Sequence, residues 1–139
     1  MADVDGGPAK KKEAFVTTSE FKRRVLLADD NKDAVESMAM LLELSGHDVH
    51  RAYSGPEALE IAARIHPEVI VLDIGMPGMD GYEVAKYVRQ EPWAAGAKLI
   101  ALTGWGQEDD KRQARAAGFD HYLVKPVDPI DLERLIESV

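Results

Sequence analysis

The sequence predicts one α/β domain of three layers, a doubly wound (βα)5 parallel sheet with helices on both faces. Three observations carry this prediction. Short apolar stretches alternate with helix-like stretches five times along the chain. The third apolar stretch is uninterrupted, as expected of a central strand covered on both faces. Helical crossovers make the strands they join run parallel, and 139 residues suffice for one such core but not for two.

The domain is expected to follow a tail. Residues 1–21 contain Gly6, Gly7, Pro8 and a run of three lysines, without any sustained apolar period. We therefore expect a flexible N-terminal tail over 1–21 and one folded domain over 22–139.

The first repeat pairs a strand with an amphipathic helix. "RVLLADD" (24–30) is a short apolar stretch that ends in acids. The helix predicted over 33–47 has apolar residues at helical spacing and stops at Gly46, a typical residue just past a helix end. "DVHRAYS" (48–54) is half polar, which predicts an edge strand.

The middle of the chain repeats the pattern. The helix predicted over 54–66 begins with Ser54 as N-cap and Glu57 as the glutamate of a capping box. "EVIVLD" (68–73) is the predicted central strand, and a helix over 81–90 follows it.

The last part of the chain holds two further strands and helices. Strands are predicted over 97–104 and 120–126, and a polar helix over 108–118 lies between them. The final helix, over 128–138, has Asp128 as its N-cap. The pattern itself does not fix the order of the strands in the sheet.

Composition limits the class of protein. Hydrophobic residues make up 45% and charged residues 30%, which is typical of a globular protein. No apolar run is long enough to span a membrane, and because the N-terminal stretch has no apolar h-region we expect no signal peptide. The absence of cysteine excludes disulfides and thiolate metal sites and suits a cytoplasmic protein. A net charge of −8 argues against a nucleic-acid surface.

Reactive side chains follow four of the five predicted strands. Asp29 and Asp30 end the first, Asp73 ends the third, Thr103 ends the fourth and Lys125 ends the fifth. Because the carboxyl ends of parallel strands share one edge of the sheet, we expect these groups to meet there. Each alone would be ordinary: a helix-capping acid, a β-forming threonine, a solvated lysine. Together they predict a site.

The chemistry of this set points to phosphoryl transfer. Three neighbouring carboxylates raise one another's pKa unless a cation compensates, and oxygen ligands without histidine or cysteine favour Mg²⁺. A lysine and a hydroxyl would add contacts to a phosphoryl group. With no other nucleophile present, a carboxylate would accept that group as an acyl phosphate. The four histidines are scattered at element ends and are interpreted as surface or packing residues.

Four motifs carry a resemblance to a known family. They are "ADD" (28–30), "VLDIGMPGMDG" (71–81), "ALTG" (101–104) and "LVKP" (123–126). In this order and spacing the chain resembles the receiver (REC) domain of two-component response regulators over roughly 22–139. Within that family, the sequence around its motifs is most similar to that of the receivers of hybrid histidine kinases. The resemblance implies a flavodoxin-like fold with strand order 2-1-3-4-5.

The resemblance also implies a site. Asp73 would be phosphorylated, and Asp30 and Asp73 would bind Mg²⁺ directly. Asp29, largely through water, and the backbone carbonyl of Gly75 would complete the metal site. The phosphodonor would be a phosphohistidine on a histidine kinase or a histidine phosphotransfer protein. The domain would not be a conventional enzyme, since it catalyses only its own phosphotransfer and slow autodephosphorylation.

A conformational switch is implied as well. Lys125 would pair with the phosphoryl oxygens, and Thr103 would move to hydrogen-bond the phosphate. Tyr122, the aromatic switch residue, would then turn inward. The Lys125–Pro126 peptide bond is expected to be cis.

The family's usual contact surfaces imply where partners bind. The first helix, about 33–45, would dock the phosphodonor, and the 107–139 surface would bind a downstream protein. The sequence ends at its last predicted helix, so we expect no DNA-binding output domain and no membrane partner. A stand-alone receiver and an excised part of a hybrid kinase both fit.

Two positions depart from the common family pattern. Gly75 stands where many members carry a side chain over the phosphate, and Trp105 is a bulky ring where smaller residues are common. We hypothesise that both set the lifetime of the aspartyl phosphate, Gly75 by admitting water and Trp105 by partly shielding the site.

Three other classes of protein fit the sequence less well. A haloacid-dehalogenase-type phosphatase needs a second acid two residues after its nucleophile, where this chain has Gly75. An FMN-binding flavodoxin-like module needs a Ser/Thr-rich loop after the first strand, where this chain has "DDNKD". A phosphorylation-independent interaction module typically lacks one or more of the acids or the lysine, and all are present here.

Overall fold

The computed structural model describes residues 22–104 and 108–139, the first three of the latter by backbone only. The expected tail over 1–21 and Trp105 lie outside the described residues. None of the helices in the described part is long and apolar enough to cross a membrane.

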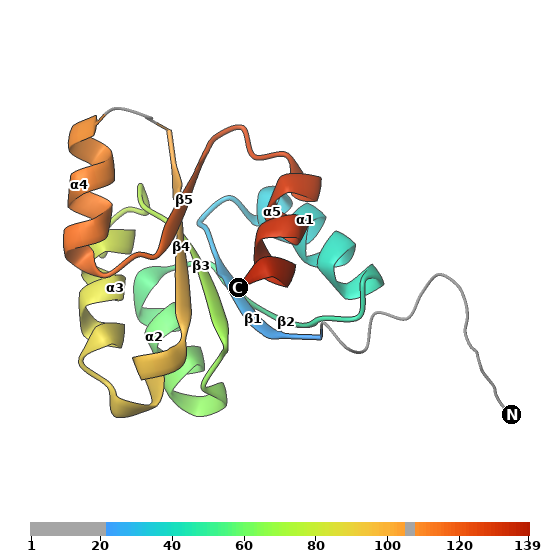
Figure 1. The fold of residues 1–139 in the computed structure, drawn as a ribbon, viewed down its shortest axis with the longest axis horizontal. Helices are drawn as coiled ribbons and strands as arrows, with labels where there is room; N and C mark the ends of the chain where they lie inside the picture. Colours follow the sequence, from blue (N-terminus) through green and yellow to red (C-terminus); the bar gives the residue numbers. More distant parts are fainter. Residues whose placement is uncertain (1–21, 105–107) are drawn as a thin grey trace, which may run out of the picture.

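In the described part of the chain, five strands and five α-helices alternate (Figure 1). In order, the elements are β1 (Arg24–Ala28), α1 (Lys32–Leu44), β2 (Asp48–Ala52), α2 (Gly55–Ile65), β3 (Val69–Asp73), α3 (Gly81–Arg89), the 3₁₀ helix η3 (Pro92–Gly96), β4 (Lys98–Thr103), α4 (Glu108–Ala117), β5 (His121–Val124) and α5 (Pro129–Ser138).

The strands form one parallel sheet in the order β2-β1-β3-β4-β5. This confirms the parallel sheet predicted from the repeats and the strand order implied by the family resemblance. The half-polar strand β2 is an edge strand, as predicted. Strand β3 is at the centre and all five of its residues are buried, Asp73 included.

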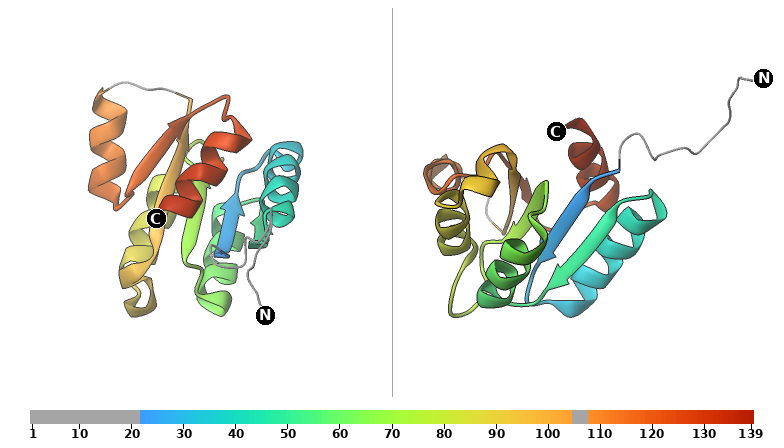
Figure 2. Two further views of the ribbon diagram at one scale, coloured as in Figure 1. Left: turned by 45° about the vertical axis from the view of Figure 1, so that its right-hand side comes forward. Right: turned by 90° about the horizontal axis from the view of Figure 1, so that it is seen from below.

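Two apolar clusters make the core, one on each face of the sheet. Helices α1 and α5 cover one face, and α2, α3 and α4 cover the other (Figures 1 and 2). Successive residues of β3 alternate between them: Ile70 and Leu72 pack under α2–α4, whereas Val69 and Val71 pack under α1 and α5. Fixing β3 from both faces also fixes the position of its last residue, Asp73.

The predicted helix starts and stops are mostly as expected. Gly46 has φ of 96° just past α1, and the side chains of Ser54 and Asp128 accept the expected capping hydrogen bonds. The predicted capping box is wrong in its second hydrogen bond, in which Glu57 would accept from the backbone N–H of Ser54. Glu57 accepts its hydrogen bond from the backbone N–H of Tyr53, one residue before Ser54, at 2.7 Å.

The short helix η3 was not predicted, and Arg89 fastens it to its surroundings. The Arg89 guanidinium donates to the carbonyls of Ala94, Ala97 and Gly118 and forms an ion pair with Asp120 at 2.7 Å. This junction joins the ends of α3, η3 and α4 to the start of β5. It lies at the opposite end of α4 from Thr103.

Candidate functional site: an acidic cluster at the carboxyl edge of the sheet

The structure brings the predicted site residues together. Asp29 directly follows β1, Asp73 and Thr103 end β3 and β4, and Lys125 directly follows β5. The pairing register explains this juxtaposition, because Asp73 lies opposite Leu102 and Thr103 lies opposite Val124. The backbone N–H of Lys125 donates to the Thr103 carbonyl at 2.7 Å.

Three carboxylates form a potential metal site. Oxygens of Asp29, Asp30 and Asp73 all lie within 4.8 Å of one another. Asp29 and Asp73 are buried, 1% and 6% exposed, whereas Asp30 is exposed. A hard divalent cation is the group that such an oxygen-only set can hold.

Asn31 holds Asp29 in place and caps α1, a role that the sequence motifs did not indicate. Its backbone N–H donates to Asp29 Oδ1 at 3.0 Å, and its own Oδ1 accepts from the N–H of Ala34 at 3.1 Å to cap α1. The N-cap of α1 is therefore Asn31, and neither preceding acid caps the helix. "Asp-Asp-Asn" before an apolar period contains this signal, because asparagine is a strong N-cap residue.

Lys125 bridges two of the carboxylates. Its Nζ lies 3.1 Å from Asp29 Oδ2 and 3.0 Å from Asp73 Oδ1. Partial burial by itself lowers the pKa of Lys125, but hydrogen bonds and charge from Asp73 and Asp29 outweigh it and raise the pKa. Lys125 is therefore a cation at physiological pH. The peptide bond to Pro126 is cis, as the resemblance implies.

The turn after β3 orients Asp73. The Gly75 N–H donates to Asp73 Oδ1 at 3.1 Å, and the backbone of Gly81 passes close to the end of β3. A Cβ on Gly81 would lie 2.7 Å from the Asp73 carbonyl oxygen. At Gly75 a Cβ would meet only Asp73 Oδ1, at 3.8 Å, so a side chain would fit there. No described residue therefore fills the space beside Asp73 Oδ1 at Gly75.

A cavity of about 420 Å³ opens beside Asp73. Asp73, Thr103 and Lys125 line it, together with Tyr82 of α3 and Gln113 of α4. Sequence reasoning missed both Tyr82 and Gln113, because no motif marks them. Tyr122 is not among the described residues that line this cavity; it lines a separate hollow on the outer face of α4, β5 and α5.

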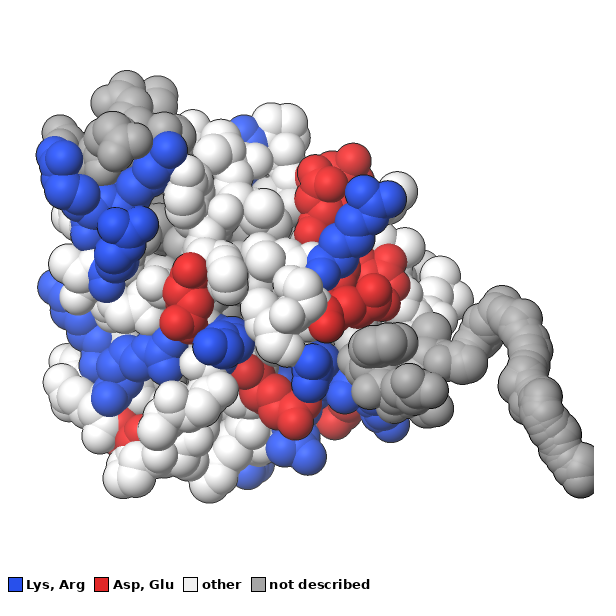
Figure 3. All heavy atoms as spheres, viewed as in Figure 1, with Lys and Arg blue, Asp and Glu red and all other residues white. Residues whose placement is uncertain are grey.

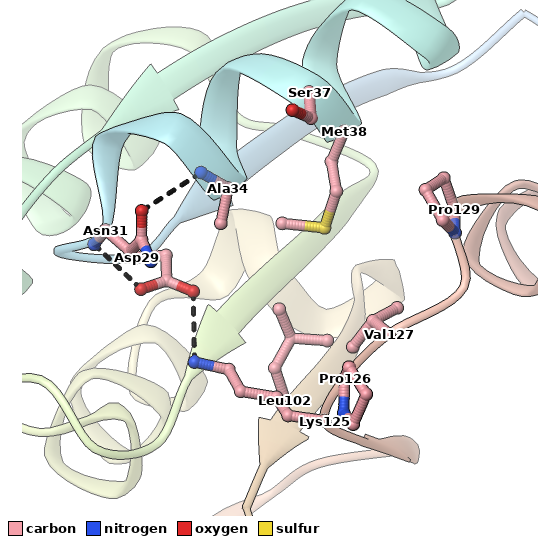
Figure 4. A pocket seen from close by; sticks show the side chains of 10 residues that line it. All are labelled: Asp29, Asn31, Ala34, Ser37, Met38, Leu102, Lys125, Pro126, Val127 and Pro129. Carbon is pink, nitrogen blue, oxygen red and sulfur yellow. Dashed lines mark hydrogen bonds and ion pairs between the residues drawn. The ribbon is translucent and has the colours of Figure 1, made fainter.

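A second cavity, of about 510 Å³, flanks the site on the α1 side. Figure 4 shows its walls: Ala34, Ser37 and Met38 of α1 face the segment after β5. That segment contributes Pro126, Val127 and Pro129. Asp29 and Lys125 join the two walls through their ion pair (Figure 4). The acidic site thus borders a largely apolar groove.

Comparison with known proteins agrees with this geometry. The family model of the response regulator receiver domain matches residues 25–137. An uncharacterized 14.6 kDa protein of Leptolyngbya boryana is 39% identical over 114 residues, which are 82% of this chain and 87% of that protein. The polar-differentiation response regulator DivK of Brucella ovis is 32% identical over 84% of this chain and 93% of its own.

A solved structure shows the same fold. The chemotaxis protein CheY4 of Vibrio cholerae superposes with a TM-score of 0.81 at 30% identity, and the match covers 85% of this chain and 98% of that one. The family model matches residues 25–137, and the acidic cluster lies at the carboxyl edge of the sheet. The chain therefore belongs to the response regulator receiver family, whose members act as phosphoacceptors in two-component signalling.

Proposed function

We propose that Asp73 is the phosphoacceptor and that it takes a phosphoryl group from a phosphohistidine on a histidine kinase or a histidine phosphotransfer protein. The observation that carries this proposal is the setting of its carboxylate. Oδ1 is engaged by the Gly75 N–H at 3.1 Å and by Lys125 at 3.0 Å. No hydrogen bond from another described residue reaches Oδ2, which leaves that oxygen as the nucleophile.

The transfer step is a displacement at phosphorus. An electron pair of Asp73 Oδ2 forms the new P–O bond, and the P–N bond to the donor imidazole breaks. The imidazole nitrogen leaves with the electron pair, and the product is an aspartyl phosphate. Lys125, a cation between Asp29 and Asp73, balances charge on the phosphoryl oxygens.

The acidic cluster fits Mg²⁺. Its donors are carboxylate oxygens from three side chains within 4.8 Å, with Asp30 exposed and able to reach solvent. We propose Asp30 and Asp73 as direct ligands, Asp29 as a ligand largely through water, and the Gly75 carbonyl as a further donor. When bound, Mg²⁺ supplies the positive charge that lets the carboxylates and the phosphoryl group approach one another.

Autodephosphorylation needs water at the phosphorus atom. Water attacks phosphorus, the P–O bond to Asp73 breaks, and inorganic phosphate leaves. Because Gly75 has no side chain over Asp73, we propose that access for water is open and that the phosphate is short-lived relative to receivers with a bulky residue there. The hypothesis that Trp105 partly shields the phosphate stays a prediction, because Trp105 lies outside the described residues.

The switch is proposed to run through β4 and β5. Thr103 is 6% exposed and lines the cavity beside Asp73, so its hydroxyl would hydrogen-bond a phosphoryl group there. Tyr122 is half-buried on the neighbouring strand. We propose that it turns from the outer face toward the space that Thr103 vacates. The altered 107–139 surface would then bind a downstream protein.

A mass measurement tests the proposal. The chain is incubated with acetyl phosphate and Mg²⁺, and we expect the mass of one phosphoryl group to appear and to be removed by hydroxylamine. Asp73→Asn or EDTA should abolish it. Asp131→Asn, which removes an exposed acid on α5, should leave it unchanged. Full modification of Asp73→Asn would overturn the assignment.

A further inference from the structure

The ring of Tyr122 lies beneath a cation from the neighbouring helix. The Lys111 Nζ is 5.4 Å from the centroid of the Tyr122 ring. Lys111 belongs to α4 and Tyr122 to β5, and the two elements pack together. The contact is within the distance at which an ammonium is attracted to the negative face of an aromatic ring.

In this arrangement Tyr122 is not among the described residues that line the cavity around Asp73. Tyr122 lines a hollow of about 500 Å³ on the face of α4, β5 and α5, together with Arg115 and Arg134. The cavity around Asp73 is bounded by other described residues, among them Thr103 and Gln113. A rotation of Tyr122 inward would therefore take the ring out from under Lys111.

The surrounding charge favours a cation at this place. Figure 3 shows basic side chains gathered over α4, on a chain whose net charge is −8. Arg115 is one helical turn beyond Lys111 and lines the same hollow as Tyr122. Lys111 is half-buried. Its ammonium is thus less freely solvated than one on a fully exposed side chain, and this strengthens attraction to the ring.

We propose that Lys111 is a positioning residue for the Tyr122 switch, which it stabilises in the outward orientation before phosphorylation. This inference rests on the proposed switch function of Tyr122. A contact made in only one of two orientations shifts the equilibrium toward that orientation. Lys111 therefore reduces the fraction of unphosphorylated molecules that have already switched, and the phosphoryl group must displace the ring from it.

The test compares three variants in the complete chain. Lys111→Met removes the charge and keeps the length of the side chain, whereas Lys111→Arg keeps a cation. Lys86→Met, at an exposed position on α3, makes the same change in net charge elsewhere. Beryllofluoride with Mg²⁺ serves as the phosphoryl mimic, and its affinity is measured by titration. The ring signals of labelled tyrosine are followed by NMR and assigned with Tyr122→Leu.

We expect Lys111→Met to bind beryllofluoride about two- to fivefold more tightly than the wild type, the factor that one weak cation–π contact represents. Its Tyr122 ring signal should move, without the mimic, toward the position seen in the mimic-bound wild type. Lys111→Arg and Lys86→Met should behave as the wild type. In a Tyr122→Leu background, Lys111→Met should have no effect, because the cycle isolates the pair.

Two results would overturn the inference and separate it from the proposed function. Equal affinities for Lys111→Met and Lys86→Met, or an effect of Lys111→Met that persists without the Tyr122 ring, would show that Lys111 does not act through Tyr122. The phosphoacceptor proposal would stand in either case. A wild-type chain that does not bind beryllofluoride would instead remove the proposed function and this inference with it.

Discussion

Asp29 and Asp30 are adjacent in sequence, but their surroundings give them different tasks. Asp29 is buried, with Oδ1 bound by the Asn31 N–H and Oδ2 paired with Lys125. Asp30 is exposed, and its oxygens approach the others only as part of the acidic cluster. Asp29 therefore positions Lys125 as well as adding charge, whereas the proposed role of Asp30 is mainly that of a metal ligand.

This difference predicts how the two acids respond to neutralisation. Asp30→Asn should weaken Mg²⁺ binding about tenfold or more, because a direct carboxylate ligand is lost. Its stability without metal should not fall, since one of three like charges has been removed. Asp29→Asn should weaken metal binding and also lower the stability, because the amide NH₂ would face a donor in either orientation, the Lys125 ammonium or the Asn31 N–H. Mg²⁺ titration and urea unfolding in EDTA measure both; a less stable Asp30→Asn would contradict this view.

His47 gives a second prediction, concerning pH. It is buried and its Nδ1 accepts from the Arg23 N–H at 3.0 Å, while Nε2 is buried with no hydrogen-bond partner in the described structure. Burial lowers the pKa of His47; Arg23 lowers it further, and the charge of Glu137 opposes the shift only in part. In the folded protein His47 therefore binds a proton less readily than in the unfolded chain, whose histidine pKa is about 6.5.

The sign follows from this depression of the pKa. The contribution of His47 to the free energy of unfolding is fully present above the histidine pKa of the unfolded chain, about 6.5. It falls as the pH drops from there toward the folded pKa, because in that range the histidine is protonated only in the unfolded chain. His47→Asn keeps an acceptor for Arg23 but cannot titrate. When the pH is lowered from about 7.5 to about 5.5, urea unfolding should show a smaller loss of stability for His47→Asn than for the wild type. Equal losses would exclude His47 as a contributor.

At the scale of elements, periodicity and capping residues predicted the existence and type of the five strands and five α-helices in the described part of the chain, but not the 3₁₀ helix η3. The structure departs from these predictions where contacts with other parts of the chain determine the local conformation. Glu57 bonds to Tyr53 because the chain enters α2 from the end of β2. The helix η3 forms at a proline, and its backbone carbonyls find their donor in Arg89, a residue of another helix. Local sequence does not contain that partner.

Gly81 shows how an element boundary controls the site. It begins α3, and a Cβ there would lie 2.7 Å from the Asp73 carbonyl oxygen and 2.9 Å from the Cα of Ile74. Both neighbours are backbone atoms, so they cannot rotate away. Gly81→Ala should lower the free energy of unfolding by about 1–3 kcal/mol, the usual effect of overpacking, and should weaken Mg²⁺ binding by displacing Asp73.

Gly96 provides the matched control. A Cβ at that position would meet nothing within 4 Å, and its φ is not in the left-handed region. Gly96→Ala should leave both the free energy of unfolding and Mg²⁺ affinity within error of the wild type, or raise stability slightly through the unfolded chain. Urea denaturation and Mg²⁺ titration of both variants distinguish a close approach at Gly81 from a general sensitivity to alanine.

At the scale of the whole molecule, the sequence predicted which groups meet but not how they are arranged. Parallel strands with helical crossovers bring Asp29, Asp73 and Lys125 to one edge of the sheet, independently of the conformation of the loops. The choice of Asp73 Oδ1 as the oxygen that pairs with Lys125 depends on the turn at Gly75. Tyr82 and Gln113 reach the cavity through the packing of α3 and α4, which no local pattern encodes.

We propose that helix α1 presents the face on which a protein phosphodonor docks, and this gives a last prediction. Met40 and Leu44 lie one turn apart on the outer side of α1 and are 59% and 84% exposed, an unusual exposure for large apolar side chains. Helix α1 begins beside the acidic cluster and borders the apolar groove after β5. A protein donor that brings its histidine to Asp73 would cover this surface, whereas a small donor would not need it.

Leu44→Glu should therefore separate the two kinds of donor. Transfer from a phosphorylated histidine phosphotransfer protein that modifies the wild type should slow about tenfold or more, because a charge would be buried in the docking surface. Modification by phosphoramidate should proceed at the wild-type rate, since Asp73 and its partners are untouched. Tyr87→Glu, an equally polar change at a 52% exposed site on α3 across the sheet, should slow neither reaction. Equal slowing with both donors would place the effect at Asp73 itself and exclude α1 as the docking face.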